Sequence, residues 1–214
     1  KLFLGWGIKA DLTVDLSFYC QPKHVEGMVR QAHNGKNYVV LSLRPSRNFT
    51  KNKYTIFAQT CDFITSKYGL NIILLPFSSD PKKDTRALNK IFELSTHKRN
   101  IFLYENGLKL EKILEILQGG VVTIAMRLHA GILSLLVNTP VISINYMKKS
   151  GSFWEDTEIP QIDIQSGDLF AELIAKVDMV LLGAKKARAS VEALASRSKS
   201  NALDEKEKLL SKIV

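Results

Sequence analysis

A chain of 214 residues with 45% hydrophobic side chains can bury a sizeable core, which excludes disordered, collagen-like and coiled-coil chains. No apolar run approaches the roughly 18 residues that a membrane-spanning helix needs, so we expect a soluble protein. The net charge of +9 suits nucleic acid, an anionic membrane surface or a phosphorylated small molecule, and does not choose among them. The two cysteines are too few for a disulfide scaffold and favour a reducing cytoplasm.

The first 37 residues stand apart from the pattern that follows. They carry Gly5, Gly7 and Pro22 and contain no buried-strand run like those further along the chain. The chain begins at Lys1 and shows no cleavage-site pattern, so we interpret it as entered part-way through and expect no signal peptide. We therefore predict that residues 1–37 are a linker from a preceding part of the protein.

From Tyr38 onward, short apolar runs alternate with stretches of helical spacing. The runs are rich in Val, Ile and Leu with little alternation, as expected of strands buried on both faces. Their spacing of about 20 to 33 residues is typical of βαβ units in a parallel sheet. We predict an α/β fold with a Rossmann-like parallel sheet flanked by helices. The predicted strands are 38–43, 72–75, 101–103, 121–125 and 141–144.

The helical stretches are marked by apolar residues three or four positions apart. One face of residues 54–68 and one of residues 108–117 show this spacing, and the second stretch is followed by a Gly-Gly stop. After Tyr146 we expect irregular chain as far as Ile164, and then helices over about 168–182 and 187–213. The predicted domains are 38–182, which is Rossmann-like, and 183–214, a helical extension.

In an open parallel sheet, ligands bind beyond the carboxyl ends of the strands, where the strand order reverses. If the strand order is 3-2-1-4-5, this position lies between the first and fourth predicted strands. Arg44 follows the first of these strands, and Arg127 and His129 follow the fourth. We therefore expect these cationic side chains to face each other across the switch point.

Arg127 and His129 also break a local rule, because cations at a helix start are opposed by the helix dipole. Free amides at that position welcome an anion, so a strongly anionic ligand between the two side chains would explain the arrangement. The alternative is that Arg127 reaches sideways to a carboxylate and His129 fills a gap in the core. The loop residue Lys148 is open to both a solvated and a ligand-binding role. The sequence contains neither a phosphate-binding GxxxxGK[ST] or GxGxxG loop nor a cluster with metal-ligand spacing.

The segment 121–148 resembles the signature of the polysaccharide pyruvyl transferase family. In that family a strand ends in Met/Ser-Arg-Leu/Phe-His, a helix follows, and a Pro-Val strand leads to a Tyr-x-x-Lys loop; this chain has Met-Arg-Leu-His at 126–129. Three weaker pieces follow the family order. They are 15–18 (Asp-Leu-Ser-Phe, where the family has Asp-Pro-x-Phe), 41–45 (Leu-Ser-Leu-Arg-Pro), and 74–77 (Leu-Leu-Pro-Phe) with Asp84.

The resemblance implies the C-terminal, donor-binding half of a GT-B-like architecture. It implies an enzyme that moves pyruvate from phosphoenolpyruvate onto sugar hydroxyls of a cell-surface or cell-wall polymer as a ketal. His129 and Arg127 would be catalytic, and the substrate-binding residues would be Arg44, Arg127, Leu128 and Lys148. With most of the N-terminal half absent, whether this chain is active alone stays open.

The same resemblance and the chemistry of the donor set the expected partners. Arginines can neutralise the phosphate, so we expect neither a metal nor another cofactor. The partners would be phosphoenolpyruvate and a polysaccharide or lipid-linked glycan, without nucleic acid. The location would be cytoplasmic, with peripheral association at the inner face of the membrane as an option.

Two other functions stay open. A GT-B glycosyltransferase or sugar epimerase that uses a nucleotide sugar shares the fold and the anion-binding helix start, and Glu155, Asp156 or Glu158 could hold its ribose. A basic nucleic-acid-binding domain would need clustered Lys and Arg on an exposed face. The C-terminal helix mixes basic with acidic residues, which fits that role poorly.

Overall fold

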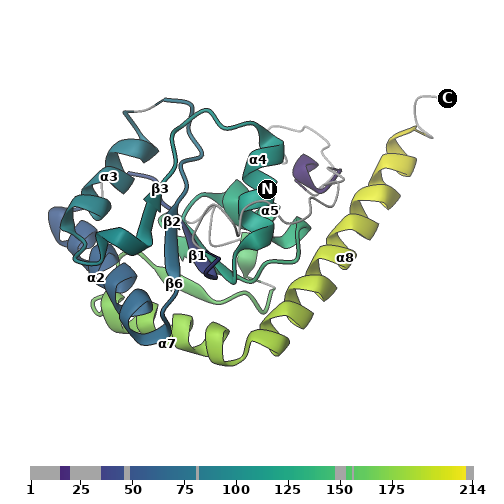
Figure 1. Ribbon diagram of the computed structural model, residues 1–214. Coiled ribbons are helices and arrows are strands. Elements are labelled where there is room, and N and C mark those ends of the chain that lie inside the picture. Colours follow the sequence, from purple (N-terminus) through teal and green to yellow (C-terminus); the bar gives the residue numbers. More distant parts are fainter. Residues whose placement is uncertain are drawn as a thin grey trace.

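A six-stranded parallel sheet forms the centre of the molecule (Figure 1). The computed structural model describes residues 15–19, 35–45, 49–80, 82–147, 153–155 and 157–210. Every neighbouring pair of strands is parallel. The strands in spatial order are β3 (Ile101–Leu103), β2 (Asn71–Leu74), β1 (Tyr38–Ser42), β4 (Val122–Ala125), β5 (Val141–Asn145) and β6 (Gln161–Asp163).

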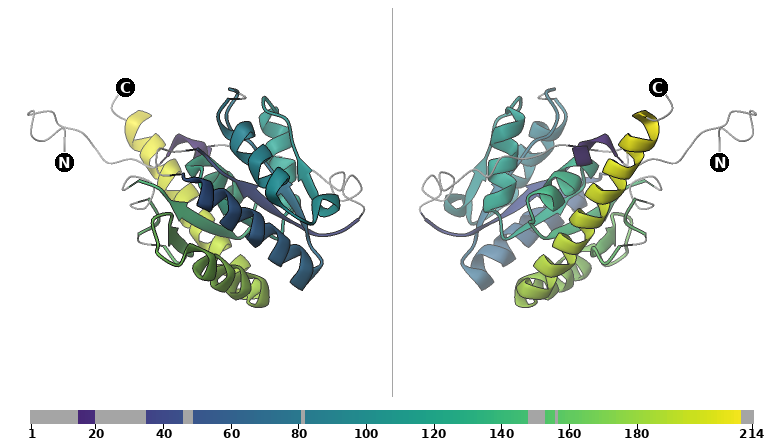
Figure 2. Two further views of the ribbon diagram at one scale, coloured as in Figure 1. Left: turned by 90° about the vertical axis from the view of Figure 1, so that its left-hand side faces the viewer. Right: turned by 90° about the vertical axis from the view of Figure 1, so that its right-hand side faces the viewer.

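Helices cover both faces of the sheet (Figure 2). Because successive strand residues point to opposite faces, Val39 and Leu41 of β1 join one hydrophobic cluster while Tyr38 and Val40 join the other. The first cluster includes α2 (Lys51–Tyr68), α3 (Asp84–Leu94) and α7 (Leu169–Leu182). The second includes α4 (Leu110–Gly119), α5 (Leu128–Leu136), α8 (Ala184–Leu210) and the short 3-10 helix η2 (Leu16–Tyr19); another, η3 (Lys98–Asn100), precedes β3.

The parallel sheet and the helical stretches confirm the predicted α/β fold. All five predicted strands are present within about one residue of their predicted bounds. The helices α2, α4, α7 and α8 occupy the predicted helical stretches, except that α4 begins at Leu110 and residues 211–213 lie outside the described residues. The prediction of irregular chain from Tyr146 to Ile164 is wrong at β6, which pairs with β5 from Gln161 to Asp163. This strand has only Ile162 buried between two polar residues, so it shows none of the apolar run that marked the others.

The Gly-Gly stop predicted after α4 is found at Gly119 and Gly120, for a different physical reason. Gly120 follows the helix in an extended conformation (φ −73°, ψ 148°) that any residue can adopt. A Cβ on Gly119 would instead lie 2.2 Å from the Tyr38 hydroxyl, which donates to the Ile116 carbonyl at 2.8 Å. Glycine is therefore required by the close approach of α4 to β1.

Along the described part of the chain, none of the helices combines the length and apolar character needed to cross a lipid bilayer. The longest, α8, has 27 residues and many charged side chains. It follows α7 at Gly183 and runs past α5 toward the C-terminus (Figure 1).

Candidate functional site

The strand order reverses between β1 and β4, and the two predicted arginines follow these strands. β1 connects through β2 to β3 on one side, and the chain then returns to place β4 on the other side of β1. Ser42 of β1 is paired with Ala125 of β4. Arg44 and Arg127 each lie two residues beyond that pair, so they stand at the same carboxyl edge on adjacent strands.

Arg44 is an exposed side chain held by a residue from another strand. Its Nη1 donates to the Tyr146 hydroxyl at 3.0 Å, and its guanidinium carbon lies 5.5 Å from the centre of the Tyr146 ring. Tyr146 directly follows β5. The contact therefore joins the ends of β1 and β5 across the end of β4 and limits the directions in which the guanidinium can point.

Arg127 is a half-buried residue that pairs with Asp84. Its Nε donates to Asp84 Oδ2 at 2.9 Å and its Nη2 donates to Asp84 Oδ1, a bidentate ion pair. The Arg127 side chain is 20% exposed and the Asp84 side chain is fully buried. Arg127 thus reaches sideways to a carboxylate, as one of the two interpretations of its position required, while its side chain keeps some exposure.

His129 is the second residue of α5 and is exposed. Its side chain is 62% accessible, so it does not fill a gap in the core, and its Nε2 lies 3.7 Å from Asp15 Oδ2. The other Asp15 oxygen accepts the backbone N–H of Ser17 at 2.9 Å, which fixes the carboxylate at the start of η2.

The start of α5 adds backbone donors to these side chains. Arg127 is the residue before the helix, with extended dihedral angles, and Leu128 is the first helical residue. The first N–H groups of a helix have no acceptor within it, and they favour an anion. Leu128 itself is half-buried and packs against the second hydrophobic cluster, so its contribution to a ligand would come from its backbone.

The body of α5 is held rigidly behind the site. The Ser134 hydroxyl donates to the Ala130 carbonyl at 2.7 Å and lies 2.9 Å from the hydroxyl of Thr123 in β4. Trp154, which is 1% exposed, lies so close to Gly131 that a Cβ there would approach its ring to 2.7 Å. The helix start is therefore fixed relative to the strand ends.

The remaining predicted site residue, Lys148, lies outside the described residues. Among the residues that the structure describes, no three His, Cys, Asp or Glu side chains are grouped so as to hold a metal ion.

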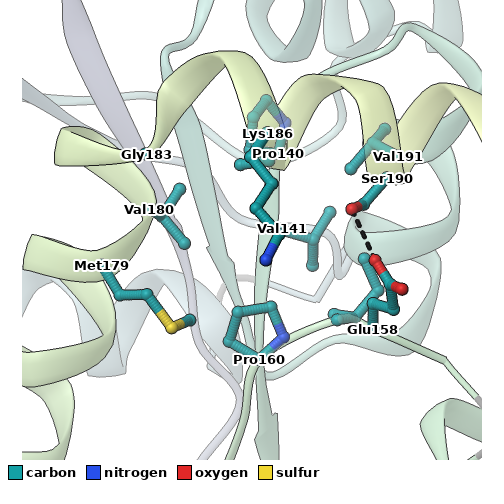
Figure 3. A pocket seen from close by; sticks show the side chains of 12 residues that line it. Pro140, Val141, Glu158, Pro160, Met179, Val180, Gly183, Lys186, Ser190 and Val191 are labelled. Atoms are coloured by element: carbon teal, nitrogen blue, oxygen red, sulfur yellow. Dashed lines mark hydrogen bonds between the residues drawn. The ribbon is translucent and has the colours of Figure 1, made fainter.

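A cavity of about 290 Å³ lies on the side of the sheet where the strands begin, away from their carboxyl ends; Figure 3 shows the residues that line it. Pro140 and Pro160, which line it, directly precede β5 and β6, so the cavity is at the amino ends of these strands. Its wall also contains Glu158, which accepts from the Ser190 hydroxyl at 2.7 Å. This cavity is separate from the cluster of cations at the carboxyl ends.

Two carboxylates of the site were not predicted from sequence to act there. Asp84 and Asp15 were noted only as parts of family-like segments, without a role. For Asp84 the sequence held a weak signal of its place in the fold. Acidic side chains are stabilised by the helix dipole in a first helical turn, and Asp84 begins α3. The partner of Arg127 depends on which strands are neighbours, which the local pattern did not contain.

Comparisons with known proteins give a family and a fold for this chain. A sequence model of the family described as polysaccharide pyruvyl transferase matches residues 1–148. No curated protein matches the chain significantly.

Among solved structures, the chain is similar to UDP-N-acetylglucosamine 2-epimerase from Neisseria meningitidis bound to UDP-GlcNAc, with a TM-score of 0.60, 10% identity, and coverage of 86% of this chain and 47% of that one. HepE from Anabaena in complex with UDP-glucose gives a TM-score of 0.58, 13% identity, and 86% and 51% coverage. An α,α-trehalose-phosphate synthase from Burkholderia vietnamiensis gives a TM-score of 0.57 and 10% identity, with coverage of 82% of this chain and 44% of that one.

The chain therefore spans about half the length of the solved structures that it matches. Identities this low show the fold alone. The fold is that of one half of GT-B-like epimerases and glycosyltransferases, with a parallel sheet flanked by helices.

Proposed function

Because this chain belongs to the polysaccharide pyruvyl transferase family, we propose that it binds phosphoenolpyruvate and supports transfer of its pyruvyl group to a sugar. The observation that carries the proposal is the placement of Arg44 and Arg127 on adjacent strand ends beside the start of α5. In this proposal, residues 38–182 are the donor-binding unit.

The donor carries a carboxylate and a phosphate, and the proposed site offers matching donors. Planar guanidinium groups bind both anions through paired hydrogen bonds. Arg44 and the accessible part of Arg127 would hold these groups, and the backbone amides at Leu128 and His129 would add hydrogen bonds to the phosphate. Lys148 would be an auxiliary phosphate contact.

The reaction requires one proton at carbon and two sugar oxygens at the same centre. A proton adds to the methylene carbon of phosphoenolpyruvate, and a sugar hydroxyl adds to the central carbon and loses its own proton. The bond to phosphate then breaks, the phosphate leaves with the bonding pair, and a second hydroxyl completes the ketal. The two hydroxyl protons balance the one gained by carbon and the one carried by the released phosphate.

His129 is the residue that we propose for this proton traffic. Its imidazole is exposed at the helix start, where a substrate can reach it, and Asp15 lies on its Nε2 side. As a cation it would also stabilise the leaving phosphate.

The acceptor would be a polysaccharide or a lipid-linked glycan, and the location cytoplasmic, at the inner face of the membrane in the lipid-linked case. Since the chain spans about half of the GT-B-like structures that it matches, we propose that a second half of the enzyme binds the acceptor opposite this edge.

A thermal-shift panel tests the donor. Phosphoenolpyruvate should raise the melting temperature, because a ligand at 100 times its Kd adds about 2.7 kcal/mol, while UDP, UDP-GlcNAc, GDP and short DNA should not. Arg44→Gln should reduce the shift, whereas Arg99→Gln, a matched change in η3 at the amino end of β3, should leave it unchanged. A wild-type protein that is not stabilised by phosphoenolpyruvate would contradict the proposal.

The second candidate function is nucleotide-sugar chemistry. It is favoured by the likeness in fold to the Neisseria meningitidis epimerase and to HepE, whose structures contain UDP-GlcNAc and UDP-glucose. Stabilisation by UDP without stabilisation by phosphoenolpyruvate would select this function.

A further inference from the structure

Asp84 joins three segments of the chain at the proposed donor site. It is the first residue of α3 and is fully buried. Its Oδ2 accepts the backbone N–H of Phe77 at 3.0 Å and of Ser78 at 2.9 Å, both in the loop after β2. The same oxygen accepts from Arg127 Nε at 2.9 Å, and Oδ1 accepts from Arg127 Nη2.

These bonds make the Asp84 carboxylate a fixed anchor. A buried charge is retained only where hydrogen bonds and an opposite charge compensate it. Here two backbone N–H groups hold Oδ2 whether or not Arg127 is present, so the loop after β2 sets the position of the carboxylate. Arg127 is then aligned by a carboxylate whose position does not depend on Arg127.

The geometry of a guanidinium shows what this alignment leaves available. Asp84 occupies the edge formed by Nε and one hydrogen of Nη2. The second edge, formed by Nη1 and the other hydrogen of Nη2, has no acceptor among the residues that the structure describes. Because the group is planar and two bonds fix its plane, that second edge points in one set direction.

We propose that Asp84 is a positioning residue that fixes Arg127, so that the second edge of the guanidinium binds an anionic group of the donor. This proposal rests on the proposed function. A guanidinium held in place before binding loses less conformational freedom when the ligand arrives, which raises affinity. A lysine could pair with Asp84 but would have no second edge to present.

The test is a double-mutant cycle on phosphoenolpyruvate affinity, measured by calorimetry. In Asp84→Asn the amide oxygen can still accept the two backbone N–H groups and Arg127 Nε–H, while its NH₂ faces Nη2, so that the second bond and the opposite charge of the pair are lost. Affinity should fall at least 10-fold in this variant. In the Arg127→Lys background, the same change should cost less than about 3-fold, because the two losses have one cause.

Asp62→Asn is the matched control. Asp62 also accepts two backbone N–H groups, from Thr96 and His97, but at the amino end of β3. Its replacement should leave phosphoenolpyruvate affinity unchanged. If Asp84→Asn does not fold, Asp84→Glu should show the same dependence on Arg127, since the longer side chain displaces the guanidinium.

A signal from the free protein completes the test. The Arg127 Nε–H resonance should be observable at neutral pH without donor, because the carboxylate protects the proton from exchange. In Asp84→Asn this proton should exchange faster, because a neutral amide oxygen replaces the carboxylate. A resonance unaffected by Asp84→Asn, or equal losses of affinity in both Arg127 backgrounds, would overturn the positioning role. A wild-type protein that does not bind phosphoenolpyruvate would overturn the proposed function instead.

Discussion

His129 combines exposure with a carboxylate neighbour, and its proposed role is in chemistry rather than in donor binding. His129→Gln should therefore keep phosphoenolpyruvate affinity close to wild type. Turnover should fall by roughly 10²- to 10⁴-fold, the usual contribution of one positioned acid or base. The measurements are calorimetry and pyruvate transfer to an oligosaccharide, in an enzyme that includes the acceptor-binding half.

His97→Gln is the control for this variant, since His97 lies beside Asp62 near the amino end of β3, away from the carboxyl ends of the strands. If affinity and turnover fell together by the same factor at His129, the residue would be a donor ligand. If neither changed, the proposed mechanism would be wrong.

Asp178 of α7 provides a pH-dependent link to the end of α2. Lys67 Nζ lies 2.7 Å from one Asp178 oxygen and the Tyr68 hydroxyl donates to the other at 2.5 Å. Lys67 first, and then Tyr68, hold the pKa of the Asp178 carboxyl below its ordinary value of 3.8. A carboxyl whose pKa is lower in the folded state stabilises the fold above its unfolded pKa and loses this contribution as the pH falls through the folded pKa.

Asp178→Asn should therefore lower the free energy of unfolding at neutral pH, and the difference from wild type should shrink as the pH falls below about 4. Urea unfolding at several pH values measures it. In a Lys67→Met background, the pH-dependent part of the difference should be smaller. A difference that stays constant between neutral and strongly acidic pH would argue against the link.

For the residues of the site, the sequence predicted positions in the fold but not the residues that they contact. Arg44, Arg127 and His129 could be located from sequence, because the carboxyl-end rule needs only the ends of apolar runs. Their partners could not. Asp84 is 43 positions from Arg127 and Tyr146 is 102 positions from Arg44. These pairs form only once β2, β1, β4 and β5 lie side by side in that order.

At the scale of the elements, α4 packs against β1 so closely at Gly119 that a side chain there would overlap Tyr38. Gly119→Ala should destabilise the protein by about 1–3 kcal/mol, because the added Cβ meets the Tyr38 hydroxyl oxygen and the packing has no spare room. In a Tyr38→Phe background the same change should cost less, since the nearest atom is then the ring carbon, 3.1 Å away. Urea unfolding of the four proteins measures both costs.

Gly167→Ala is the matched control, because a Cβ at that position has nothing within 4 Å, and it should be close to neutral. An equal cost of Gly119→Ala in both backgrounds would contradict the contact.

Elements were predictable where burial leaves a continuous apolar run. The four central strands β2, β1, β4 and β5 are covered on both faces, and apart from Asn71 and Asn145 at strand ends their residues are apolar or small. At the end of the sheet β6 has one exposed and one half-buried polar residue around Ile162, so its pattern is that of a loop. Its strand pairing comes from β5 rather than from its own composition.

At the scale of the whole molecule, the second hydrophobic cluster joins segments far apart in sequence. Phe18 of η2 stacks on Phe153 with 6.5 Å between ring centres, and the neighbouring Trp154 packs against α5 at Gly131. Val191 and Ala195 of α8 close the same cluster. The domain core therefore depends on residues from both ends of the described chain.

Trp154→Ala should lower the free energy of unfolding by about 3–5 kcal/mol, the usual cost of removing a buried large aromatic side chain. Phe153→Ala should cost less, because that ring is only half-buried. Denaturant unfolding followed by circular dichroism measures both. A cost for Trp154→Ala below about 1 kcal/mol would mean that the second cluster does not depend on this ring.

The two outer strands have a further consequence for how copies of this protein meet. An outer strand offers its backbone as a template for strands of other molecules, and long apolar ones promote aggregation. Within the described residues, β3 and β6 have three residues each, and Asp163 places a charge on β6. Because both outer strands are short and β6 carries a charge, the sheet is a poor template for strands of other molecules. Concentrated protein should therefore resist fibril-like growth, and the apolar β3 should be the more vulnerable of the two outer strands.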